Sequence, residues 1–90
     1  MSKAIVDPEE LRRFAEELKR FNGDLQNSMS SLQARFGALS DTWQDHEHAK
    51  FAQEFTETMK VLRRFMETSN QQGPFLLRKA QRIEEYLNQR

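Results

Sequence analysis

The chain has 90 residues, which fits one small domain over residues 1–90 with only a thin core of its own. Its 14 basic and 14 acidic residues cancel, so composition argues against a nucleic-acid or anionic-lipid partner, and the lack of cysteine excludes disulfides and thiolate metal sites. Residues 1–6 lack the apolar run of a cleaved signal peptide, and no segment is apolar enough for stable membrane insertion.

The first predicted helix covers about residues 8–39. Asp7 can cap this helix, and Pro8 suits its first position. Large apolar residues then recur at steps of three or four: Leu11, Phe14, Leu18, Phe21, Leu25, Met29, Leu32, Phe36 and Leu39. Asn22-Gly23-Asp24 could by itself signal a turn, but the uninterrupted stripe predicts an amphipathic helix that continues through it.

A short turn at about residues 40–45 is expected to lead into a second helix over about 46–70, with Ser40 or Asp41 as its cap. The apolar residues of the second helix again have helical spacing: Phe51, Phe55, Met59, Leu62 and then Phe65 or Met66.

Gly73-Pro74 interrupts this pattern. Proline lacks a backbone donor and restricts the residue before it, so we expect the second helix either to end or to bend sharply here. A short third helical segment is predicted over about 74–88, with Leu76, Ala80, Ile83 and Leu87 on one face.

These elements predict an all-α fold, an antiparallel helical hairpin. The apolar stripe of the first helix is wider than one helix–helix seam, so we expect two hairpins to pair as a four-helix bundle dimer. The residues expected to pack within the hairpin or against the partner are Leu11, Phe14, Leu18, Phe21, Leu25, Met29, Leu32, Phe36, Phe55, Met59, Leu62 and Phe65. The sequence does not divide them between those two roles.

The turn carries Leu39, Trp43, Asp45 and Phe51 in an arrangement that resembles the WXG-motif, or ESAT-like, family of small helical hairpins associated with type VII secretion. In that family a Trp-x-Gly turn joins two long helices, with an apolar residue before the tryptophan and an aromatic residue about eight positions after it. Asp45 replaces the glycine, so we expect this turn to be built differently.

The resemblance implies a protein that acts by association with other proteins, as a type VII secretion substrate or a helical adaptor. The implied partners are a second copy in an antiparallel homodimer, a related small helical protein, a secretion ATPase or a larger effector. Trp43 and Tyr86 are the implied recognition residues; a simpler role for Trp43 is to seal the end of the bundle. The resemblance also implies a cytoplasmic protein that is exported without a cleaved signal peptide.

An alternative is a cytoplasmic structural or regulatory coiled-coil module without an export role. Secreted members often carry an acidic residue four positions after the tyrosine, whereas Tyr86 is followed by Arg90, which favours this alternative.

No catalytic, cofactor or metal site is expected. In the run Asp45-His46-Glu47-His48 only Asp45 and His48 have a spacing that suits two ligands on one helix face, and two ligands do not close a metal site. No nucleophile–base arrangement or glycine-rich phosphate loop is present. The basic residues of the second half are Lys60, Arg63, Arg64, Arg78, Lys79 and Arg82. Acidic residues interleave with them, which favours an ordinary solvated face over nucleic-acid binding.

Overall fold

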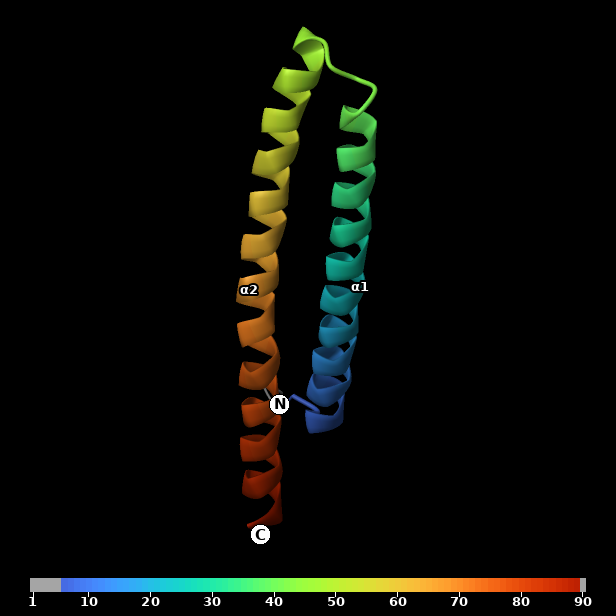
Figure 1. The fold of residues 1–90 in the computed structure, drawn as a ribbon. Helices are drawn as coiled ribbons and strands as arrows, with labels where there is room; N and C mark the ends of the chain where they lie inside the picture. The colour runs from blue at the N-terminus through green and yellow to red at the C-terminus, as the bar shows by residue number, and fades with distance from the viewer. Residues whose placement is uncertain (1–5, 90) are drawn as a thin grey trace.

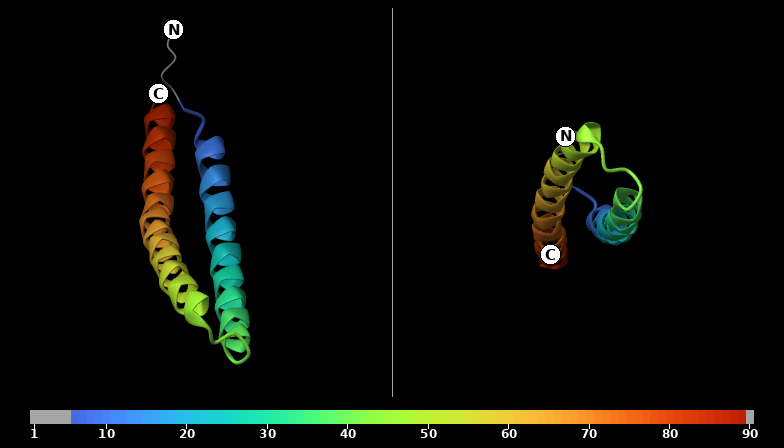
Figure 2. Two further views of the ribbon diagram at one scale, coloured as in Figure 1. Left: turned by 90° about the horizontal axis from the view of Figure 1, so that it is seen from above. Right: turned by 45° about the horizontal axis from the view of Figure 1, so that its top comes forward.

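The structure, a computed structural model, describes residues 6–89 as two long helices side by side. Helix α1 covers Pro8–Ser40 and helix α2 covers His46–Asn88. The helices run antiparallel and form a rod of 69 × 19 × 18 Å, with the turn at one end and the start of α1 and the end of α2 toward the other (Figures 1 and 2). The predicted helical hairpin is therefore confirmed.

The start of α1 follows the capping pattern of the sequence. The Asp7 carboxylate accepts a hydrogen bond of 2.9 Å from the backbone N–H of Glu9, and Pro8 occupies the first turn, where no backbone donor is needed. The Glu10 carboxylate accepts a 2.7 Å hydrogen bond from the Arg13 side chain. The helix begins at the predicted residue and ends one residue after the predicted end.

Helix α2 is a single helix of 43 residues, with Pro74 inside it. The prediction of a separate third segment after Gly73-Pro74 is therefore wrong. A Cβ at Gly73 would meet nothing within 4 Å, so crowding against α1 does not require glycine there. Glycine instead removes the Cβ that would clash with the proline ring, which allows helical geometry before Pro74. Beyond the proline, Leu76, Ala80 and Ile83 are at least partly buried and hold the helix to α1.

The two helices meet along one narrow seam. Its fully buried apolar residues are small or flexible: Ala15, Met29, Met59 and Ala80. Half-buried residues extend the seam at helical spacing: Leu11, Leu18, Leu25, Phe36, Phe55, Leu62, Met66, Leu76 and Ile83. On α2 the seam positions alternate steps of three and four, which is the repeat of a coiled coil. Within residues 6–89, no helix is long and apolar enough to cross a membrane.

Candidate functional site

The turn between the helices is short and hydrogen-bonded to the end of α1. The backbone N–H of Trp43 donates to the carbonyl of Leu39 at 3.0 Å, and that of Asp41 donates to the carbonyl of Ala38 at 3.1 Å. These bonds satisfy carbonyl groups that the last turn of a helix leaves free. The chain therefore reverses direction over residues 41–45 without any positive φ angle.

Asp45 is the residue that organises the turn. Its backbone is extended, with φ −89° and ψ −176°, and it caps α2 by accepting a 3.1 Å hydrogen bond from the N–H of His48. The same carboxylate oxygen accepts a 2.8 Å hydrogen bond from the indole N–H of Trp43. The expected caps, Ser40 and Asp41, are thus wrong for α2: Ser40 is the last residue of α1 and Asp41 is the C-cap of α1.

Five rings gather where the two helices approach the turn: Phe36, Trp43, His48, Phe51 and Phe55. We call this group the aromatic cluster. The Phe36 ring lies at its centre, 5.3 Å from the His48 ring, 5.6 Å from Phe51 and 5.0 Å from Phe55. Trp43 contacts the edge of this group, with its ring 5.1 Å from His48 and 5.8 Å from Phe51. These rings seal the turn end of the seam.

The polar atoms of His48 also have partners. Its Nε2 lies 2.8 Å from the hydroxyl oxygen of Ser40, and that hydroxyl donates to the carbonyl of Phe36 at 3.0 Å. The direction of the bond between Nε2 and the hydroxyl depends on which ring nitrogen of His48 carries the proton. His48 therefore links the two helices by both a hydrogen bond and a ring stack.

Of the four turn-motif residues, three come together. Trp43, Asp45 and Phe51 are in contact through the hydrogen bond and ring contact given above, whereas the side chain of Leu39 is 45% exposed. The Asp45-His46-Glu47-His48 run forms no cluster of three or more metal-binding side chains, a statement that covers the described part of the chain.

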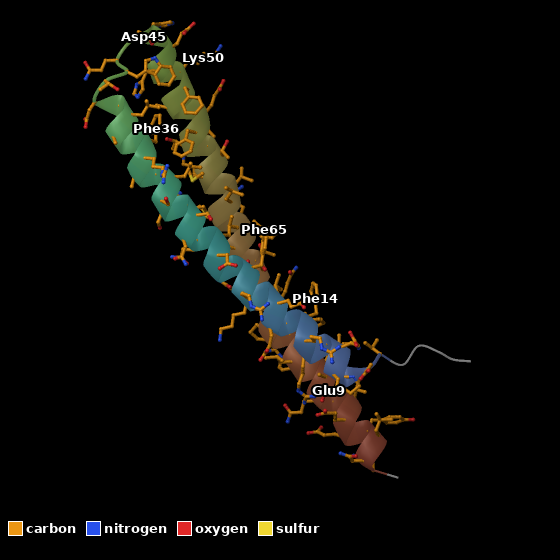
Figure 3. The ribbon with its side chains drawn as sticks, turned by 90° about the vertical axis from the view of Figure 1, so that its right-hand side faces the viewer. Glu9, Phe14, Phe36, Asp45, Lys50 and Phe65 are labelled. Carbon is orange, nitrogen blue, oxygen red and sulfur yellow. The ribbon has the colours of Figure 1, made fainter. Side chains whose placement is uncertain are left out.

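The apolar stripe divides into a buried and an exposed part. Phe14, Phe21, Leu32 and Phe65 are 56%, 52%, 50% and 46% exposed in the single chain. They were expected to pack either within the hairpin or against a partner, and the hairpin itself covers only about half of each. On α1 the separations are seven and eleven residues, close to two and three helical turns, so the three side chains share one side of the helix. The rings of Phe21 and Phe65 meet edge to face with their centres 6.2 Å apart, so Phe65 of α2 lies beside these three side chains of α1. We call these four residues the Phe face; Figure 3 shows Phe14 and Phe65 along one edge of the rod.

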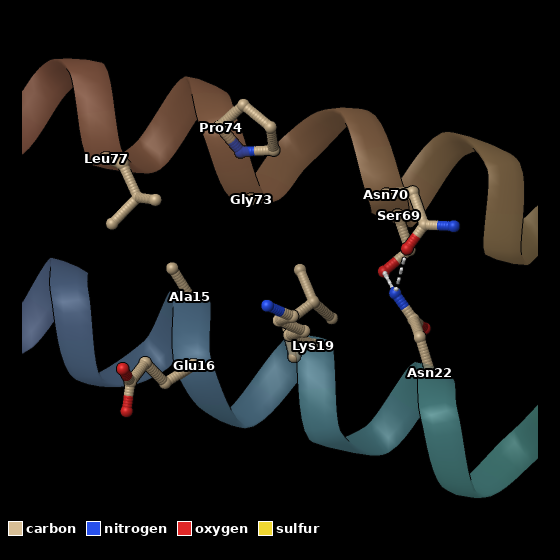
Figure 4. Close-up of a pocket in the computed structure, with 10 residues that line it drawn as sticks. Ala15, Glu16, Lys19, Asn22, Ser69, Asn70, Gly73, Pro74 and Leu77 are labelled. Atoms are coloured by element: carbon tan, nitrogen blue, oxygen red, sulfur yellow. Dashed lines mark hydrogen bonds between the residues drawn. The ribbon is translucent and has the colours of Figure 1, made fainter.

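A groove of about 440 Å³ lies between the helices on another side of the seam. Figure 4 shows Ala15, Lys19 and Asn22 of α1 opposite Ser69, Gly73 and Leu77 of α2. The groove exists because the facing seam residues are small. Inside it, the Asn22 amide donates to the Ser69 hydroxyl at 2.9 Å and to the Asn70 side-chain oxygen at 3.1 Å.

Comparison with known proteins places this geometry in a family. The family model described as proteins of 100 residues with WXG, named WXG100, matches residues 4–88. The chain belongs to the WXG100 family. This confirms the resemblance to the ESAT-like proteins associated with type VII secretion, whose fold and length the chain shares. No curated protein sequence matches the chain.

Solved structures agree with this assignment. The chain is similar to the secreted protein EsxB of Bacillus anthracis strain Sterne. A single-residue mutant of EsxB matches with a TM-score of 0.81 and 25% identity, covering 94% of this chain and 96% of the other. The wild-type protein matches with a TM-score of 0.78 and 25% identity, covering 93% and 97%.

For a WXG100 protein, the turn of this chain is built with an aspartate in the glycine position. Since the backbone at Asp45 is extended, the conformational freedom of glycine is not needed there. The carboxylate instead supplies a helix cap and an acceptor for the tryptophan. The tryptophan of this WXG100 chain is therefore held in place by its own turn.

The two expected recognition residues lie far apart in this WXG100 hairpin. Trp43 is in the turn, and Tyr86, which is 69% exposed, is near the other end of α2. Helix α2 spans roughly 65 Å between them. One chain therefore does not bring them together. Arg90 lies outside the described residues.

Two polar contacts across the seam were not anticipated from the sequence. Asn22 and Ser69 are almost completely buried and bonded to each other, and the Arg12 side chain makes a two-pronged hydrogen bond to the Glu84 carboxylate. Arg12 lowers the pKa of Glu84 from its ordinary value, chiefly by hydrogen bonding, and Glu84 in turn raises the pKa of Arg12. The spacing of Asn22, four residues after Leu18 and three before Leu25, could have predicted that its side chain lies in the seam.

Proposed function

We propose that this chain pairs through the Phe face with a second small helical hairpin, and that the pair is a type VII secretion substrate or helical adaptor. The observation that supports pairing is the exposure of the Phe face, whose four large apolar side chains are each about half exposed. Such side chains aligned along a rod favour packing against another helical surface.

The antiparallel four-helix bundle is the proposed form of the pair. Each hairpin would bring two helices. The Phe face combines three side chains along α1 with Phe65 of α2, so a second hairpin can cover it by packing against both helices. The partner is a second copy or a related small WXG100 protein. In an antiparallel pair, the turn of one hairpin lies beside the C-terminal end of the other, so Trp43 of one chain and Tyr86 of its partner would be neighbours.

We also propose that the role is non-catalytic. The side chains at the turn that could serve as a base or nucleophile have structural partners: His48 is bonded to Ser40, and Asp45 caps α2 and holds Trp43. These partners support a turn that presents a fixed shape to other proteins rather than one that transforms a substrate.

Replacing Phe21 with glutamate tests the pairing. The carboxylate would have to be buried in the interface, so assembly should be lost, while the isolated hairpin should keep its helices because Phe21 is half exposed. Light scattering after size exclusion, across a dilution series and with the candidate WXG100 partner added, measures the mass of the assembly. Circular dichroism measures helix content.

Leu77→Glu is the matched control. Leu77 is 45% exposed, similar to Phe65, but it lines the groove with Lys19 rather than the Phe face. An assembly that survives Phe21→Glu, or that is lost equally with Leu77→Glu, would contradict a role for the Phe face.

Export is the second part of the proposal, and the similarity to a secreted protein supports it. Arg90 in place of an acidic residue favours the alternative, a coiled-coil module that stays in the cytoplasm. A tagged chain produced in the native host distinguishes the two. Accumulation in the culture supernatant, lost when the secretion ATPase is deleted, is the result expected of a substrate; retention in the cells under both conditions would favour the cytoplasmic module.

A further inference from the structure

The outer side of α2 carries a second distinctive surface near its C-terminal end. Residues 68–83 contain three basic residues, Arg78, Lys79 and Arg82, and no acidic residue, although the charges of the whole chain cancel. Within the described residues, no ion pair joins any of the three to a carboxylate. This segment therefore carries a local positive charge that the hairpin does not neutralise.

Two exposed aromatic residues flank these cations. Phe75 is 51% exposed and Tyr86 is 69% exposed. Counted from Phe75, the positions of Arg78, Lys79, Arg82 and Tyr86 are three, four, seven and eleven residues further on, so all five share one side of the helix over about 16 Å. We call them the C-terminal cationic face.

Most of this face lies beside the contact with α1 rather than in it. Leu76, Ala80 and Ile83 of the same segment pack on α1 and are partly or fully buried, whereas Phe75, Arg78, Arg82 and Tyr86 are exposed. Lys79, at the border with the packing residues, is half buried. The nearby carboxylate of Glu84 is bonded to Arg12, and that of Glu85 accepts a 3.4 Å hydrogen bond from Gln81. Neither carboxylate is joined to the three cations, so their charge is available to another molecule.

We propose that the C-terminal cationic face docks an acidic amphipathic helix of a partner protein. Two aromatic anchors with cations between them match a helix that presents apolar side chains flanked by carboxylates. The length of the face, about three helical turns, suits one helix rather than a broad interface.

A protein helix fits this surface better than a membrane does. A helix that lies in a membrane needs a wide apolar side, whereas here the apolar seam residues of this segment pack on α1 and the outer side carries charges between its two aromatic residues. Phe75, Arg78 and Arg82 do not belong to the Phe face, so variants at these three residues test docking separately from the pairing proposed above. Tyr86 is shared with the recognition residues of that proposal, and the test therefore leaves Tyr86 unchanged.

The test measures binding of a fluorescein-labelled peptide of about 20 residues, with leucine and glutamate at amphipathic helical spacing, by fluorescence anisotropy. The double variant R78E/R82E should weaken binding at least about tenfold, and raising the salt from about 50 to 300 mM should weaken binding to the natural sequence. The control R63E/R64E makes the same change of charge at two exposed arginines on the same helix and should change the affinity less than about twofold. Circular dichroism checks that both variants remain helical.

The variant Phe75→Ala tests the aromatic part of the surface in the same binding assay without changing its charge. It should also weaken binding of the peptide, because it removes one anchor. Absence of binding by the natural sequence, equal weakening by the two double variants, or an unchanged affinity in Phe75→Ala would overturn the proposal. So would stronger binding, dependent on Arg78 and Arg82, to vesicles of phosphatidylserine and phosphatidylcholine than to the peptide, since the surface would then be a membrane site.

Discussion

The two halves of the hairpin use their phenylalanines in opposite ways. Near the turn, Phe36, Phe51 and Phe55 contact one another across the two helices and close the seam. In the other half, which ends away from the turn and which we call the open half, the fully buried apolar residues are the small Ala15 and Ala80, and Phe14 and Phe21 lie mostly outside the seam. The turn half thus packs Phe36 and Phe55 within the hairpin, with Phe51 41% exposed at their edge, while the open half leaves its phenylalanines available to another chain.

This difference separates the side chains that stabilise the hairpin itself from those that are available to bind a partner. Small seam residues let the helices of the open half approach closely, but they bury little apolar area and so contribute little stability. The aromatic cluster brings larger rings into contact across the seam, and we expect it to anchor the hairpin at the turn. We expect the turn half to be the more stable half of an isolated chain, and the open half to gain stability when the Phe face is covered.

The substitutions Phe36→Ala and Phe21→Ala give the strongest test of this difference between the two halves. Removing the central ring of the aromatic cluster should lower the free energy of unfolding by about 2–3 kcal/mol, less than for a fully buried phenylalanine because Phe36 is only half buried. Removing Phe21, which is 52% exposed and touches Phe65, should cost the isolated hairpin about 1 kcal/mol or less. Urea denaturation measures both.

The losses in the free energy of unfolding can also be compared at different protein concentrations, which adds a second test. The cost of Phe21→Ala should rise with protein concentration if the partner is a second copy, or on addition of the partner if it is a different chain, because binding stabilises only the folded state. A Phe36→Ala effect no larger than that of Phe21→Ala in dilute protein would contradict the division between the two halves.

The sequence could predict that the phenylalanines of both halves lie on or near the apolar stripe. It could not predict which of them pack within the hairpin and which stay exposed. Steps of three and four place Phe14 and Leu18 equally well, and only the position of α2 decides that Leu18 is half buried and Phe14 exposed. Asn22 fell outside the prediction for a related reason. Its polar side chain was not counted in the stripe, although a partner on α2, Ser69, allows its burial.

Two further expectations failed for local reasons. A separate third helical segment was expected after Gly73-Pro74, but glycine relieves the clash before proline, and the residues beyond it pack on α1. The cap of α2 was expected at Ser40 or Asp41, because both residue types are good N-caps and both lie in the predicted turn. The physical preference of aspartate for the N-cap would have identified Asp45.

Asp45→Ala tests how much of the turn depends on this one carboxylate. The substitution removes the acceptor for the His48 N–H and for the Trp43 indole N–H, and should lower the free energy of unfolding by about 1–2 kcal/mol. It should also alter the fluorescence of Trp43, because the indole loses its partner and becomes more mobile. Asp41→Ala is the control, since Asp41 is exposed and is the C-cap of α1. Equal losses of stability in the two variants would show that the cap at residue 45 has no special role.

The smallest expected effect lies at the end far from the turn, where Arg12 and Glu84 join the helices. Because hydrogen bonding to Arg12 lowers the pKa of Glu84 in the folded chain, the contribution of this pair is complete above the ordinary glutamate pKa of about 4.3 and is lost as the pH falls through the lower folded value. Urea midpoints measured from about pH 6 to pH 3 should therefore fall more steeply for the natural sequence than for Glu84→Gln, and added salt should reduce the difference. Glu85→Gln, at the next and exposed position, should follow the natural sequence. Parallel curves for the natural sequence and Glu84→Gln would mean that the open half is held by its apolar seam alone, which would make the contrast with the turn half sharper still.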